Sequence, residues 1–252
     1  MNAPALNLSR PPIVEAVLDI DCDMPPTTEF AALEAPARDR FGSQYPKFRT
    51  QFIKEHLIKQ EGSAPPEMSV RQGIQAFRFF QDDEKQLVQV RPQGFSFNRL
   101  APYSSLDYYL PEIERTWRLF VELAAPAQIR LIRLRYINRI LLPVTAGRVE
   151  LDDYLRVGPR LPDGLDLTLA GFLHQYSAVQ AGTENRVNIV LTAQPQEGDK
   201  LPVVLDIEAF KSADQDPNDW PSVHADIQSL RVLKNLVFEK SLTTRCVKLF
   251  QQ

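Results

Sequence analysis

The sequence predicts an α+β fold, in which a mainly antiparallel, curved sheet carries its helices on one side. Two observations support this prediction. Segments in which apolar and polar residues alternate follow one another across short polar turns, as the strands of β-hairpins do. Segments with apolar residues at helical spacing separate these runs of strands, which is typical of an antiparallel α+β protein. The face of the sheet away from the helices is expected to carry the charged residues.

The first half of the chain is predicted to follow the order β-α-β-β-α-β. Its elements are a strand at 12–22, a helix at 29–41, strands at 73–81 and 86–100, a helix from Ser104 or Ser105 to Pro126, and a strand at about 130–142. Pro36 should kink or split the first helix, and Pro111 indicates that the regular part of the second begins near it. Pro92 and Gly94 indicate a bulge or two shorter strands. Residues 47–60 fit a helix and a strand equally well.

The second half is predicted to follow the order β-β-β-α. Its elements are strands at roughly 169–181, 185–194 and 202–211, a helix from about Pro221 to Glu239, and a short helix from Thr243 or Thr244 to Phe250. Residues 143–168 are rich in proline and glycine and form the expected boundary between the halves. We therefore expect one α+β domain (1–252), or two halves at 1–145 and 165–252.

Composition limits the possible partners and cellular location of the protein. The chain has 252 residues, a net charge of −3 and an ordinary share of hydrophobic residues, 44%. Nucleic acid is a disfavoured partner because the chain has no overall positive charge. The two cysteines, Cys22 and Cys246, belong to no metal-binding motif, which favours a reduced setting. No signal-peptide pattern or apolar run of membrane-spanning length occurs, so we expect a cytoplasmic protein without a membrane partner.

Arginines are the most informative side chains of the sequence. Arg133, Arg135 and Arg139 lie an even number of residues apart in one predicted strand and therefore share a face. Arg91 and Arg99, in the preceding strand, could lie near them. Arginine binds phosphate and carboxylate in a bidentate manner, so the set could form an anion site. The alternative, which we favour, is pairing with carboxylates on neighbouring strands.

Carboxylates repeat in the same way on two other strands. Glu15, Asp19 and Asp21 share a face of the first strand, and Asp206 and Glu208 share a face of the strand at 202–211. Oxygen ligands of this kind could hold Mg²⁺ or Mn²⁺, with Glu15, Asp206 and Glu208 as the candidates. A salt-bridged or solvated sheet face is the favoured alternative.

Several short segments resemble a bacterial family of unknown function, of about this length and of sporadic distribution. They are Pro12-Ile-Val-Glu-Ala-Val, Asn98-Arg99, Arg135-Tyr-Ile-Asn-Arg, Leu205-Asp-Ile-Glu and the terminal helical run. The resemblance covers most of the chain and implies no catalytic residues. The patchy distribution of that family implies accessory loci, such as defence or toxin-related operons.

Two hypotheses about function follow from these residues. No nucleophile elbow, phosphate-binding loop, dinucleotide-binding fingerprint or zinc-protease motif occurs. The first hypothesis is therefore a non-enzymatic binding protein without a cofactor, which uses the polar face to contact another protein, a second copy of itself or a small anionic ligand. The alternative is a metal-dependent phosphohydrolase or nucleotide-binding enzyme, in which the carboxylates hold the metal and the arginines the phosphate.

Overall fold

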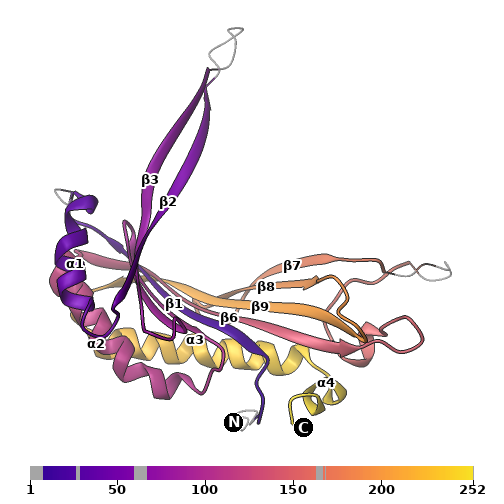
Figure 1. Cartoon of the computed structure of the whole chain (residues 1–252). Helices are drawn as coiled ribbons and strands as arrows, with labels where there is room; N and C mark the ends of the chain where they lie inside the picture. The colour runs from indigo at the N-terminus through magenta and orange to yellow at the C-terminus, as the bar shows by residue number, and fades with distance from the viewer. Residues whose placement is uncertain (1–7, 27–28, 60–66, 163–166, 168, 252) are drawn as a thin grey trace.

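The described residues form one nine-stranded antiparallel sheet with the helices on one of its faces (Figure 1). The structure, a computed structural model, describes residues 8–26, 29–59, 67–162, 167 and 169–251. The strand order is β2-β3-β4-β5-β1-β6-β9-β8-β7. The α+β class, the antiparallel sheet and the placement of the helices on one side are thus confirmed.

In chain order, the elements are β1 (Ile13–Asp23), η1 (Phe30–Leu33), α1 (Glu34–Phe41), β2 (Lys47–Lys59), β3 (Glu67–Phe80), β4 (Gln86–Arg91), β5 (Gly94–Leu100), α2 (Leu106–Ala124), β6 (Gln128–Pro143), η2 (Leu151–Asp153), β7 (Leu173–Val179), β8 (Arg186–Ala193), β9 (Lys200–Gln215), α3 (Trp220–Ser241) and α4 (Thr244–Lys248).

Strands β1 and β6 form the centre of the sheet. β1 pairs with β5 on one side and β6 on the other, and β6 continues to β9 along a register that runs from Ile129↔Gln215 to Pro143↔Lys200. The two halves expected from the sequence therefore share one sheet, joined by the β6–β9 pairing. Residues 9 and 10 also contact residue 250, because the Ser9 hydroxyl and the Arg10 backbone N–H both donate to the Phe250 carbonyl, at 2.9 and 3.0 Å.

The described sheet contains two more strands than the sequence predicted. Residues 47–59, which fitted both a helix and a strand, form β2. The predicted strand at 86–100 is two strands, β4 and β5, separated by a turn. Gly94 adopts φ 143°, and a Cβ atom there would lie 2.1 Å from the Ile20 carbonyl oxygen. Only glycine permits this close approach of the turn to β1.

Prolines shape the first two helices differently. Pro36 lies in the first turn of α1, and a separate turn of 3₁₀ helix, η1, precedes it, so the predicted split is found. The prediction that Ser104 or Ser105 caps α2 is confirmed for Ser105, whereas the prediction that the regular part of the helix begins only near Pro111 is wrong. The helix begins at Leu106 because the Ser105 side chain caps it, accepting from the Tyr108 backbone N–H at 3.3 Å. Pro111 lies on the exposed side of the helix, where the carbonyl that it leaves unpaired can be hydrated.

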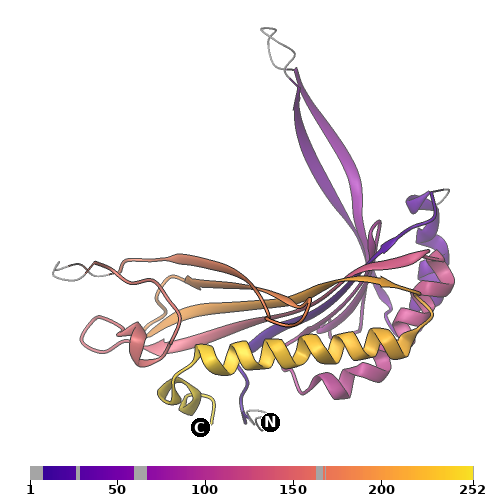
Figure 2. The same ribbon diagram turned by 180° about the vertical axis from the view of Figure 1, so that it is seen from behind.

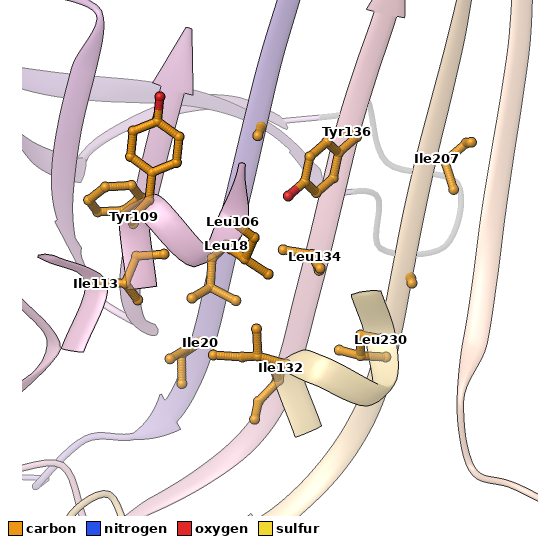
Figure 3. Close-up of a cluster of buried hydrophobic side chains, with 14 of the residues drawn as sticks. Leu18, Ile20, Leu106, Tyr109, Ile113, Ile132, Leu134, Tyr136, Ile207 and Leu230 are labelled. Atoms are coloured by element: carbon orange, nitrogen blue, oxygen red, sulfur yellow. The ribbon is translucent and has the colours of Figure 1, made fainter. Parts of the chain in front are cut away.

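The core lies between the sheet and helices α2 and α3 (Figures 1 and 2). Figure 3 shows the contact: Leu18 and Ile20 of β1 and Ile132 and Leu134 of β6 face Leu106 and Ile113 of α2 and Leu230 of α3. All of these side chains are at most 5% exposed. Cys22 and Cys246 are buried and free, and burial raises the pKa of each thiol to about 12. No helix in the described ranges combines the length and apolar composition that crossing a membrane requires.

Replacing Ile132 by alanine tests the central position of β6. Ile132 is 0% exposed, so Ile132→Ala should lower the free energy of unfolding in urea by about 2–5 kcal/mol. Val232, which is 60% exposed on α3, is the control, and Val232→Ala should change it by no more than about 0.5 kcal/mol. Equal losses in the two variants would contradict the assigned core.

Candidate functional site

The charged face is the surface of the sheet that points away from the helices. It consists of Glu15, Asp19 and Asp21 on β1, Arg91 on β4, Arg133, Arg135 and Arg139 on β6, and Asp206 and Glu208 on β9. Each of these residues has, next to it in its strand, a residue that is buried on the opposite face. For Arg139 these neighbours are Asn138 and Ile140. Successive side chains of a strand point to opposite faces, so the period of two that packs the core also gathers these charges.

Charges of opposite sign occupy neighbouring strands. The acidic residues of β1 lie beside the arginines of β6, which in turn lie beside the acidic residues of β9. In the β-ladder Asp19 is opposite Arg133, and Arg135 is opposite Glu208. Cross-strand pairs of opposite charge are favourable, whereas like charges in the same positions would repel one another.

Asp21 is the centre of one ion-paired group. It accepts from Arg91 at 2.8 Å and from Arg133 at 2.6 Å. Asp19 lies 3.6 Å from Arg91 and 3.7 Å from Arg133, and it also accepts from the Ser96 hydroxyl at 2.5 Å. These four charged side chains are only 17–25% exposed. Two arginines and two carboxylates thus neutralise one another in a partly desolvated position.

Arg135 forms the second ion pair. Its Nε lies 2.9 Å and its Nη2 2.5 Å from the carboxylate oxygens of Asp206, a bidentate arrangement. Hydrogen bonds with Asp206 raise the pKa of Arg135, and the charges of Asp206, Glu208 and Glu15 raise it further, although burial opposes them. The side chain of Arg135 is 44% exposed and that of Asp206 is 13% exposed. The guanidinium therefore covers the carboxylate and is the group that solvent meets.

The remaining charged residues also have protein partners. Arg139 donates to Glu197 at 2.5 Å and to Gln194 at 3.1 Å. Glu208 accepts from the Asn188 amide at 2.9 Å. Glu15 accepts from the Asn98 amide at 2.8 Å, and Asn98 accepts in turn from Gln89 at 2.8 Å. Hydrogen bonds thus continue across the sheet from β4 to β8.

Arg99 does not belong to this face, contrary to the prediction. Arg91 and Arg99 would share a face in one straight strand, but the turn after Arg91 reverses the chain. In the β4–β5 hairpin Arg99 lies opposite Gln86, whereas Arg91 lies opposite Gly94. Because Gln86 and Arg91 are an odd number of residues apart, the two arginines point to opposite faces. Arg99 lies on the helix side of the sheet.

The three metal candidates do not gather into one set of ligands. Asp206 is bound by Arg135, Glu208 by Asn188 and Glu15 by Asn98. Within the described part of the chain, no three His, Cys, Asp or Glu side chains lie together as a metal site requires. The geometry of these residues therefore gives no support to a Mg²⁺ or Mn²⁺ site on the charged face.

Lys234 is a chemically unusual residue that no pattern in the sequence singles out as functional. It is 8% exposed on α3, and its Nζ lies 3.6 Å from the centre of the Tyr136 ring. The Tyr136 and Tyr103 hydroxyls are 2.6 Å apart next to it. Burial lowers the pKa of Lys234 to about 7, and the charge of Arg231 contributes to the decrease. One sequence feature does indicate that Lys234 is buried: it lies four residues after Leu230 and therefore on the apolar side of α3.

Comparisons with protein-family models, with curated proteins and with solved structures find no match to this chain.

Removing Asp21 tests the ion-paired group. Asp21→Ala leaves the partly buried guanidinium groups of Arg91 and Arg133 without their shortest partner, so the free energy of unfolding should fall by about 1–3 kcal/mol. Asp214, whose side chain is 76% exposed and pairs with Arg130, is the matched control. Asp214→Ala should change the value by at most about 0.5 kcal/mol. Equal denaturation midpoints for the two variants would contradict this difference.

Lys234 should make stability depend on pH. Its pKa is about 7 in the folded protein against an ordinary value of 10.5. Below pH 7 both the folded and unfolded states hold the proton, so the folded state bears the full cost of a buried charge. Between pH 7 and 10.5 the folded state holds fewer protons than the unfolded state, and the free energy of unfolding rises with pH.

Replacement of Lys234 by methionine checks this dependence. Lys234→Met should raise the free energy of unfolding at pH 6 by about 2–5 kcal/mol, and by roughly half as much at pH 9. Lys240→Met is the control, because the Lys240 side chain is 65% exposed on the same helix. A gain for Lys234→Met that is the same at both pH values would show that the lysine is not held with a lowered pKa.

Proposed function

We propose that this protein is a non-enzymatic binding protein, and that the charged face of its sheet contacts a partner protein. The observation that carries the proposal is the combination of that face with the β2–β3 hairpin. The helices lie on the opposite side of the sheet, and the hairpin rises from the sheet on the side away from α3 (Figures 1 and 2). The hairpin and the charged face are thus adjacent surfaces on one side of the molecule.

The outer part of the β2–β3 hairpin has little support from the rest of the described chain. β3 pairs with β4 only over Phe77–Phe80, whereas its pairing with β2 extends to Glu67. Two exposed apolar side chains occupy this part of β2, Phe52 at 55% and Ile53 at 39%, on opposite faces of the ribbon. An isolated two-stranded ribbon is only marginally stable in water. A partner that packs against the hairpin would bury these side chains.

The pairing of the charged face favours a partner protein over a phosphorylated substrate. The arginines of β6 already hold carboxylates in short ion pairs. A phosphate would have to displace those carboxylates and leave them unpaired, which is unfavourable in a partly buried position. A protein surface can instead meet the more exposed groups, Arg135 and Glu197, with charges of the opposite sign. Such complementarity sets orientation and selectivity more than affinity.

Two pairs of matched variants test the proposal. Phe52→Asp alters the hairpin and Arg135→Ala alters the charged face. Val232→Asp and Arg118→Ala make the same changes at similarly exposed positions on the helices, where Val232 is 60% and the Arg118 side chain 61% exposed. Thermal melting of each variant establishes that it is folded.

The measurement combines sedimentation velocity with quantitative pull-down from a lysate of the source organism. We expect a dimer or one specific captured protein with the wild type and with both helix-side variants. Phe52→Asp and Arg135→Ala should each reduce the complex at least about tenfold, as loss of a central interface residue does. A monomer that captures nothing, or a partner that both face variants retain, would rule out the proposal.

A further inference from the structure

A polar pocket of about 660 Å³ lies on the helix side of the sheet, where β4 and β5 meet the beginning of α2. Arg99, Gln86, Tyr108, Tyr109, Glu112 and Arg115 are among the residues that line it. Its volume is within the range of pockets that hold small organic molecules. The pocket is independent of the charged face, which lies on the other side of the sheet.

Arg99 is bonded differently from the arginines of the charged face. Arg91 donates to Asp21 and Arg135 to Asp206, whereas Arg99 has no carboxylate partner among the described residues. Within the described ranges the Arg99 side chain makes one hydrogen bond, a long one of 3.4 Å from Nη2 to the Pro102 carbonyl oxygen. Its Nε is buried and has no partner in the described part of the chain. A guanidinium has five N–H donors, so most of those of Arg99 remain available.

The other charges of the pocket neutralise one another. Arg115 binds Glu112 through two bonds of 2.8 and 2.7 Å, and Glu112 also accepts from the Tyr45 hydroxyl at 2.7 Å. Burial raises the pKa of Glu112, but the hydrogen bonds from Arg115 and Tyr45 outweigh it and hold the pKa below its ordinary value. Glu112 is therefore ionised at neutral pH. One positive charge, that of Arg99, is left in excess.

The surroundings of Arg99 favour a defined geometry. Its guanidinium carbon lies 5.5 Å from the centre of the Tyr109 ring, within the range of a cation–π contact. Gln86 is 5% exposed and donates to the Tyr45 hydroxyl at 2.9 Å, which fixes one of the amide groups of the wall. Tyr108 is 74% exposed and offers an aromatic surface at the pocket.

We propose that this pocket binds a small organic anion through a carboxylate or phosphate group held by Arg99. A guanidinium with free donors is the group that binds such an oxyanion through two parallel hydrogen bonds. The pocket is larger than an inorganic ion needs, so the remainder of the ligand would lie against Tyr108 and the glutamines. The proposal does not depend on a partner protein at the charged face.

Titration of the ¹⁵N-labelled full chain tests this site at constant ionic strength. The probes are sodium phosphate and sodium benzoate, which distinguish a phosphate from a carboxylate ligand. We expect a saturable shift of the Arg99 Nε–H signal and of the backbone amide signals of Tyr108, Tyr109 and Glu112, with a Kd on the order of 1 mM for at least one probe. Arg99→Gln should weaken binding about tenfold.

Arg118→Gln is the matched control, because Arg118 is on α2 but does not line the pocket. It should leave the affinity unchanged. Absence of saturation with both probes would overturn the proposal, as would equal affinity in folded Arg99→Gln. If Arg99→Gln does not fold, the shift map of the wild type decides: perturbations centred on Arg135 instead of Arg99 reject the pocket.

Discussion

Strand β6 imposes the constraint on which the rest of the structure depends. It pairs along most of its length with β1 on one side and β9 on the other, so its backbone donors and acceptors are used by the sheet. One of its faces lies under α2 and α3 and must be apolar. The other has no helix above it and must be polar. The alternation of Ile132, Leu134 and Tyr136 with Arg133 and Arg135 satisfies both requirements within one strand.

The choice of arginine on β6 then determines what its neighbours must be. Several adjacent cations on a partly buried face would repel one another unless anions lay between them. β1 and β9 provide carboxylates on each side: Asp21 accepts one bond from each of Arg91 and Arg133, and Asp206 accepts from both Nε and Nη2 of Arg135, which uses the forked geometry of the guanidinium. Shifting β1 by one residue would place Asp19 and Asp21 against the helices and Leu18 and Ile20 in solvent. The hydrophobic residues and the charged residues of β1 therefore favour the same strand register.

The sequence predicted those parts of the fold in which a local period is strong. The alternation in β1 and β6, and the helical spacing in α2 and α3, identify elements whose core residues the structure confirms. Residues 47–59 were undecided because β2 is an edge strand in which the adjacent residues Phe52 and Ile53, on opposite faces, are both exposed, so burial imposes no clear period there. The face of Arg99 was mispredicted because it depends on whether the chain reverses at Pro92 or continues, and a reversal changes the face of every later residue.

Contacts between residues far apart in the chain could not be predicted from the sequence, for a different reason. Arg91 and Asp21 are 70 residues apart, and Arg135 and Asp206 are 71 apart. Periodicity states which residues share a face of one strand but not which strands are neighbours. The strand order, and with it the partner of each charge, follows from the packing of the whole sheet. Lys234 was missed on similar grounds, because its burial depends on Tyr136 lying beneath α3.

The arginines of this protein differ in their partners, so their number alone says little about what each can bind. An arginine whose donors are filled by a carboxylate contributes shape and a paired charge to a surface, as Arg133 does. Binding a free anion there first requires the loss of a favourable pair. An arginine without a carboxylate retains its donors at no such cost, as Arg99 does beside its pocket as far as the structure describes the chain. The two proposals therefore assign different ligands to the two sides of the sheet: a protein surface to the charged face, and a small anion to the pocket at Arg99.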